Sequence, residues 1–172
     1  MANTADFFND VLEDKATILF PGEGETLSVN GGSMILKITS PMSKDQLGLY
    51  EITLPPKAIG AQLHYHRFMD EAFIVTKGEL TVGFMDGEKA APEGTVIYVP
   101  RFTPHGFRNN SDQPVTILLL FTPGQNREGF FRGLKEVLSV SPIDPAKFLQ
   151  LYNKYDSFPV DTNKMLPAKM EG

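Results

Sequence analysis

The three histidines of the chain and one glutamate are the residues whose types and spacing could carry out chemistry. His64 and His66 are one residue apart, so on a β-strand both imidazoles project from the same face and could grip one ion. Glu71 follows His66 after four residues, and His105 begins another predicted strand. Imidazoles combined with a carboxylate suit a divalent transition metal such as Fe, Mn, Ni, Cu or Zn. These residues therefore predict one metal centre without selecting the metal.

The composition excludes several other kinds of site. The 172-residue chain has no Cys, which excludes disulfides, thiolate-bound zinc, thiolate-bound iron–sulfur clusters and cysteine nucleophiles. A formal net charge of -5 argues against a nucleic-acid partner held by a broad basic surface. All imidazole chemistry must therefore use the three histidines.

No segment of the sequence has the features of a membrane span or a secretory signal. The longest apolar run, residues 115–121, is far shorter than the ~20 residues of a spanning helix. The N-terminal region mixes acidic residues with apolar ones and has no basic segment before them. We therefore expect a cytoplasmic location and no membrane partner.

Most of the chain has the pattern of a β-protein. Short runs of β-branched and aromatic residues alternate with Gly and Pro, which is typical of a β-sandwich or barrel. The predicted strands cover residues 16–20, 33–38, 47–54, 62–67, 72–76, 79–84, 95–99, 105–108 and 115–121. We therefore predict a barrel domain over residues 15–125.

A helical extension is predicted over residues 126–172. Apolar residues recur at helical spacing in residues 127–138 and 148–155, and Asp144-Pro145 is typical of a helix start. Their apolar stripes predict packing against the core; the alternative is that one helix closes the mouth of the barrel as a lid. Residues 156–172 have no period and are predicted to be irregular, and residues 1–14 are predicted to form an arm or a short helix.

The spacing of the metal-site residues resembles the two motifs of the cupin superfamily. A His-x-His pair alone is common, but here it belongs to a longer pattern. The first motif is matched by His64-Tyr65-His66, four residues, Glu71, six residues and Gly78. The second is matched by Gly94, five residues, Pro100, four residues, His105, three residues and Asn109. Together the two motifs use every histidine of the chain.

Two positions depart from the motifs, and neither is a ligand. Ala58 stands where the first motif begins with Gly, and Phe102 replaces the Gly that follows Pro100 in the second. The bulky ring of Phe102 puts the shape of this turn in doubt. Asn109 is predicted to tie down a loop through hydrogen bonds.

The resemblance implies a fold and a set of ligands. The fold would be a double-stranded β-helix, the all-β jelly-roll barrel of small single-domain bacterial cupins, some of which resemble quercetin dioxygenases. His64, His66, Glu71 and His105 would bind the metal, and Glu71 would also act as the catalytic base. Gln62, Phe73, Val75 and Phe107 share the period-two face of the ligands, so we expect them to line a substrate pocket.

Three functions remain open at this point. The leading hypothesis is a dioxygenase-type oxidoreductase that acts on a small aromatic or enolic compound bound to the metal. The first alternative is an isomerase or epimerase of a small sugar or hydroxy acid, which a basic cluster inside the barrel would favour; the cations near the motifs are Lys57, Arg67 and Arg101. The second is a non-enzymatic protein that binds a small molecule. We also expect a homodimer formed through edge strands of residues 16–38.

Overall fold

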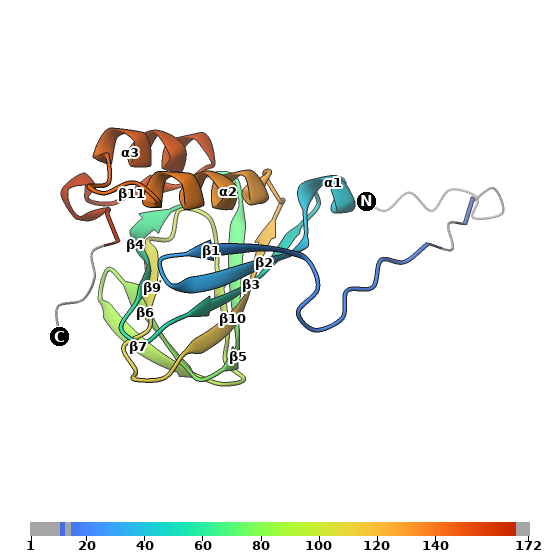
Figure 1. The fold of residues 1–172 in the computed structure, drawn as a ribbon, viewed down its shortest axis with the longest axis horizontal. Helices are drawn as coiled ribbons and strands as arrows, with labels where there is room; N and C mark the ends of the chain where they lie inside the picture. The colour runs from blue at the N-terminus through green and yellow to red at the C-terminus, as the bar shows by residue number, and fades with distance from the viewer. Residues whose placement is uncertain (1–10, 13–14, 168–172) are drawn as a thin grey trace.

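Two antiparallel β-sheets face each other in the structure, a computed structural model that describes residues 11–12 and 15–167 (Figure 1). In spatial order, the six-stranded sheet consists of β1 (Glu25–Val29), β2 (Gly32–Ile38), β3 (Gly48–Leu54), β10 (Val115–Thr122), β5 (Asp70–Lys77) and β8 (Val96–Val99). The five-stranded sheet consists of β11 (Phe158–Pro159), β4 (Ile59–Tyr65), β9 (His105–Arg108), β6 (Glu79–Phe84) and β7 (Gly87–Pro92). The prediction of an all-β jelly-roll barrel is confirmed.

The core lies between the two sheets and follows the alternation of the strands. In β3 and β10 every second residue is buried, because successive side chains of a strand point to opposite faces. Tyr50, Ile117 and Leu119 are among the fully buried residues that this alternation places inside. Large apolar side chains fill the interior of the barrel.

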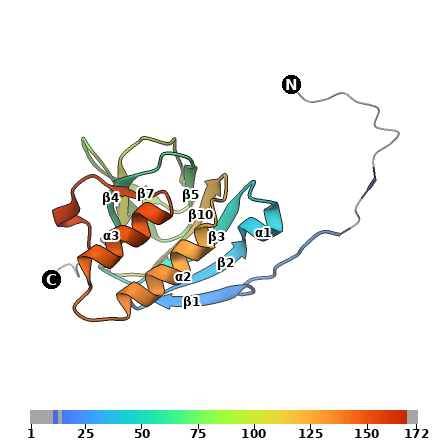
Figure 2. The same cartoon turned by 90° about the horizontal axis from the view of Figure 1, so that it is seen from above.

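Two helices cover one end of the barrel and lie side by side above the sheets (Figures 1 and 2). They are α2 (Arg127–Leu138) and α3 (Pro145–Lys154); a single turn, α1 (Ser40–Ser43), connects β2 to β3. The side chain of Asp144 accepts hydrogen bonds from the backbone N–H groups of Ala146 (2.9 Å) and Lys147 (3.3 Å), so the predicted start of α3 is confirmed. None of the helices in the described part of the chain is long and apolar enough to span a membrane.

Three local predictions were wrong or lie outside the described residues. Residues 16–20 were predicted as a strand but pair with no strand. Strands β1 and β7 were not predicted, because they form from polar stretches; each is held by hydrogen bonds to its hairpin partner. Residues 156–172 are not wholly irregular, because β11 pairs with β4 and a short 3-10 helix, η2 (Thr162–Lys164), follows. The short helix predicted within residues 1–14 falls almost entirely outside the described residues, and residues 11 and 12 are not helical.

Candidate metal centre

The two sheets bring the four predicted ligands together. His64 on β4 pairs directly with His105, the first residue of β9, and His66 lies just beyond the end of β4. Glu71 comes from β5 in the opposite sheet. The ligand atoms of all four residues lie within 4.8 Å of one another, and all four side chains are buried. The cluster could therefore hold a metal ion.

The outer nitrogen of each imidazole faces a backbone carbonyl. The Nδ1 atoms of His64, His66 and His105 lie 2.8, 2.5 and 2.9 Å from the carbonyl oxygens of Gln62, Asp156 and Thr103, respectively. A carbonyl oxygen can only accept, so each Nδ1 carries a proton and donates it. Each Nε2 is then left to act as the metal ligand, and the carbonyl fixes the orientation of the ring.

The charges at the centre call for a cation. Oε2 of Glu71 lies 3.0 Å from Nε2 of His66 and 2.7 Å from Nε2 of His105. Burial acts to raise the pKa of the Glu71 carboxyl, but His105 and His66 outweigh it and hold the pKa well below its usual range. Burial, followed by the neighbouring His105 and His66, lowers the pKa of His64. One divalent ion would bind all four ligands. The rings of His66 and His105 would then need no second proton in order to face Glu71, so the residues fit a metal.

A residue near the C-terminus fixes the position of His66. Asp156 is buried, and its carboxylate accepts hydrogen bonds from the backbone N–H groups of Arg67 (2.9 Å), Phe68 (2.8 Å) and Met69 (3.2 Å). Its carbonyl accepts the hydrogen bond from His66 described above. Sequence reasoning missed Asp156 because it lies 90 positions from His66 and follows no local pattern.

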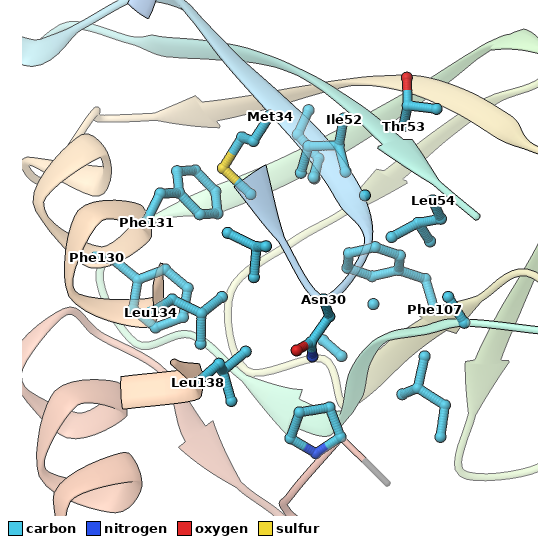
Figure 3. Close-up of a pocket in the computed structure, with 18 of the residues that line it drawn as sticks. Asn30, Met34, Ile52, Thr53, Leu54, Phe107, Phe130, Phe131, Leu134 and Leu138 are labelled. Carbon is cyan, nitrogen blue, oxygen red and sulfur yellow. The ribbon is translucent and has the colours of Figure 1, made fainter. Parts of the chain in front are cut away.

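A cavity of about 70 Å³ adjoins the centre, and Figure 3 shows part of its wall. His64 and Glu71 form part of its wall. The remaining wall is mainly apolar and combines barrel strands with both covering helices, through residues that include Met34, Ile52, Leu54, Phe107, Phe130, Phe131, Leu134 and Tyr152. Because a buried water needs roughly 10–15 Å³ by this measure, the cavity has room for a small organic molecule. The two helices therefore cover the mouth of the barrel as well as pack against it.

Of the four predicted pocket residues, one lines this cavity and three do not. Phe107 lines the cavity, whereas Gln62, Phe73 and Val75 do not. Phe73 and Val75 share the inward face of Glu71 but lie in the filled core, and Phe73 packs against Phe107. The amide of Gln62 donates instead to the carbonyl of Leu166 at 3.4 Å. Register shifts in the β4–β9 pairing interrupt the alternation on which the prediction for Gln62 depended.

Two polar side chains in the cavity wall were missed from the sequence. Arg127 is buried at the start of α2, and its Nη1 donates to the carbonyl of Tyr155 and to Oγ of Ser157, both at 2.9 Å. Burial raises the pKa of Tyr152 to about 12, so its hydroxyl remains protonated at neutral pH. The cations that the sequence singled out, Lys57, Arg67 and Arg101, are exposed. Only the docking of α2 reveals that Arg127 lies inside.

Asn109 and Phe102, both in the second motif, lie in loops whose shape the structure shows. Nδ2 of Asn109 donates to the carbonyls of Pro55 (2.9 Å) and Gln113 (2.7 Å), so its predicted role in tying down a loop is confirmed. Phe102 adopts a left-handed backbone with φ of 64°, the conformation for which the motif provides Gly. Its ring points away from the core and is 63% exposed. The substitution therefore leaves the turn before His105 intact.

Comparisons with known proteins agree with this geometry. A family model described as "Cupin domain" matches residues 50–121. Among solved structures, KdgF from Halomonas sp. is 16% identical with a TM-score of 0.58, and the match covers 66% of this chain and 99% of KdgF. The polyketide cyclase RemF from Streptomyces resistomycificus is 15% identical with a TM-score of 0.54, covering 70% of this chain and 96% of RemF. At such identities the likeness shows the fold alone.

A sugar phosphate isomerase of the cupin superfamily from Silicibacter pomeroyi is 29% identical to this chain, with a TM-score of 0.49. The match covers 55% of this chain and only 60% of the isomerase. A search of curated proteins found no match. Residues 50–121, which the family model matches, contain all four ligands of the metal centre, and the two sheets form the expected barrel. Residues 50–121 are therefore similar to the cupin domain.

Proposed function

We propose that this protein is a cupin and a metal-dependent, dioxygenase-type oxidoreductase that acts on a small aromatic or enolic compound. The observation that carries the proposal is the cavity, whose mainly apolar wall includes His64 and Glu71. An apolar site with a few converging polar groups suits an organic molecule that places one oxygen atom at the metal. The edges and faces of Phe107, Phe130 and Phe131 provide contacts for an aromatic or unsaturated body.

Each part of the site has a role in such a reaction. A divalent metal held by the four ligands would supply a Lewis acid for the substrate oxygen. Glu71 lies at the cavity wall, where its carboxylate would accept the proton of an enol hydroxyl. Residues of helices α2 and α3 form part of the cavity wall and would contact the substrate. A dioxygenase places both atoms of O2 in the product, so the substrate itself supplies the electrons.

Oxygen uptake tests this proposal. The protein is loaded separately with Fe(II), Mn(II), Ni(II), Cu(II) or Zn(II) and mixed with flavonols and small β-diketones. We expect at least one metal form to consume oxygen, and Glu71→Gln to lower the rate by about 100-fold or more. Glu79→Gln, an exposed carboxylate at the start of β6, is the matched control and should retain the rate. Metal analysis of each variant separates loss of the metal from loss of the proton acceptor; no oxygen uptake with any metal contradicts the proposal.

A second candidate is an isomerase or epimerase of a small hydroxy acid. The buried guanidinium of Arg127 in the cavity wall favours it, because such substrates carry a negative charge. This activity would exchange a carbon-bound hydrogen with solvent without consuming oxygen. Proton NMR of small hydroxy acids in D2O under nitrogen would detect it, and ligand binding with neither reaction would indicate a non-enzymatic binding protein.

A further inference from the structure

Arg127 is a buried cation with an unused hydrogen-bond donor. Only 4% of the residue is exposed, and its Nε has no hydrogen-bond partner among the described residues. Its Nη1 is held by the carbonyl of Tyr155 and by Ser157, both neutral acceptors. The ring of Phe130 lies 3.8 Å from the centre of the guanidinium. Burying a charge in such surroundings costs free energy unless an anion pairs with it.

Other arginines of the chain show what this donor edge binds when a carboxylate is available. Arg101 donates from Nε (3.0 Å) and Nη2 (3.3 Å) to the carboxylate of Asp70. Arg132 donates from the same two atoms to Glu25, at 3.0 and 2.6 Å. The arginines that form ion pairs among the described residues are Arg101, Arg108 and Arg132, and Arg127 is not one of them. The edge of the Arg127 guanidinium that contains Nε therefore lacks the carboxylate partner that the same edge has in Arg101 and Arg132.

The position of Arg127 indicates where that partner comes from. Arg127 lines the same cavity as His64 and Glu71, and the rest of the wall is mainly apolar. We propose that Arg127 binds the carboxylate of a substrate whose apolar body occupies this cavity and whose other polar end reaches the metal centre. The substrate class is thus an aromatic or unsaturated carboxylic acid, which deepens the proposed function and rests on it for the use of this cavity as the substrate site.

The geometry favours a carboxylate over a phosphate. Two parallel N–H donors of one guanidinium match the two oxygens of a carboxylate. A phosphate offers three oxygens and greater charge, and Arg127 is the one Lys or Arg among the described residues that line the cavity.

Isothermal titration calorimetry of the full metal-loaded protein tests the inference with benzoate, benzamide and inorganic phosphate as probes. We expect benzoate to bind about tenfold or more tightly than the isosteric benzamide, and phosphate to bind more weakly than benzoate. Arg127→Met keeps an apolar chain of similar length over Phe130 and should abolish the preference for the acid, while benzamide binding persists. Arg132→Met, the same change on the same helix but in an exposed ion pair with Glu25, is the matched control and should retain the preference.

Three results would overturn the inference: wild-type protein that does not prefer the acid, folded Arg127→Met that still prefers it, or phosphate that binds more tightly than benzoate. Circular dichroism and metal analysis verify that each variant is folded and loaded. If Arg127→Met does not fold, Arg127→Lys, which keeps the charge but loses the two-pronged edge, should show the same loss of preference. An acid preference through Arg127 without oxygen uptake would leave this inference standing and contradict the proposed dioxygenase activity.

Discussion

Each metal-site imidazole depends on a carbonyl that orients it, and the three carbonyls have different origins. Gln62 and Thr103 each lie two residues before the histidine that they orient, so local strand geometry positions His64 and His105. His66 depends on Asp156, which the chain brings back after α3. The orientation of one ligand in the centre thus depends on the fold of the C-terminal segment.

Replacing Asp156 should therefore weaken metal binding although it is not a ligand. Asp156→Ala removes the carboxylate that holds three backbone N–H groups beside His66, and loss of an outer partner typically costs about 10–100-fold in metal affinity. Chelator competition measures this change. Asp161→Ala, which removes an exposed carboxylate bonded to the N–H of Asn163 in the same segment, should retain wild-type affinity. Equal affinities of the two variants would contradict the role given to Asp156.

At the scale of elements, the close approach of β4 and β9 sets the spacing between His64 and His105. Gly106 follows His105, and a Cβ atom at this position would lie 2.8 Å from the carbonyl oxygen of Ala61 and 3.0 Å from the carbonyl carbon of Gln62. These are backbone atoms of β4 and cannot move aside as a side chain can. A glycine is therefore required where the two ligand-bearing strands meet.

Gly106→Ala should separate these strands and disturb the centre. We expect a loss of stability of about 1–3 kcal/mol, as for other overpacked cores, together with weaker metal binding. Chemical denaturation with and without metal measures both effects. Gly83→Ala on β6 is the matched control, because Gly83 pairs with Gly106 but its Cβ would meet no atom closer than 3.9 Å. A Gly106→Ala variant as stable as Gly83→Ala would refute the close approach.

At the scale of the whole molecule, the metal centre joins the two sheets. His64 and His105 belong to one sheet and Glu71 to the other, so a bound ion cross-links the barrel. Metal at 100 times its dissociation constant should add about 2.7 kcal/mol of stability. For a chain of this size the melting temperature should rise by about 5–10 °C. Differential scanning calorimetry before and after EDTA treatment tests this, and an unchanged melting temperature would show that the ion does not stabilise the fold.

The edge of the six-stranded sheet formed by residues 16–38 is where we expect a second copy to bind. Residues 15–24 extend away from the barrel (Figures 1 and 2), and Phe20 in this arm and Tyr98 on the edge strand β8 are each 63% exposed. A groove of about 660 Å³ between arm and sheet is lined by Leu19, Phe20, Leu49 and Leu118, among others. Large apolar surfaces at sheet edges are typical of protein interfaces.

Light scattering should give twice the 19.1 kDa mass of one chain. Phe20→Asp should convert the dimer to a monomer, because a charge in the arm opposes its burial. Phe102→Asp replaces a phenylalanine of equal exposure in a different part of the molecule and should leave the dimer unchanged. A monomeric wild-type protein would refute the expectation.

The sequence by itself determined the barrel, the four metal-site residues and the two helices. Short-range rules suffice for these features, because period-two alternation, turn residues and motif spacing all act over a few positions. Where a rule of this kind met a register shift, as at Gln62, the side chain lies outside the cavity that adjoins the metal centre.

The tertiary structure alone decided which other side chains surround the centre. Asp156 reaches His66 across 90 positions, and Arg127 enters the cavity only because α2 docks over the mouth of the barrel. An arginine in the first turn of a helix has the same sequence pattern whether it faces solvent or a cavity. What differs is the packing of the helix against the sheets, which is the sum of many weak contacts between residues far apart in the chain.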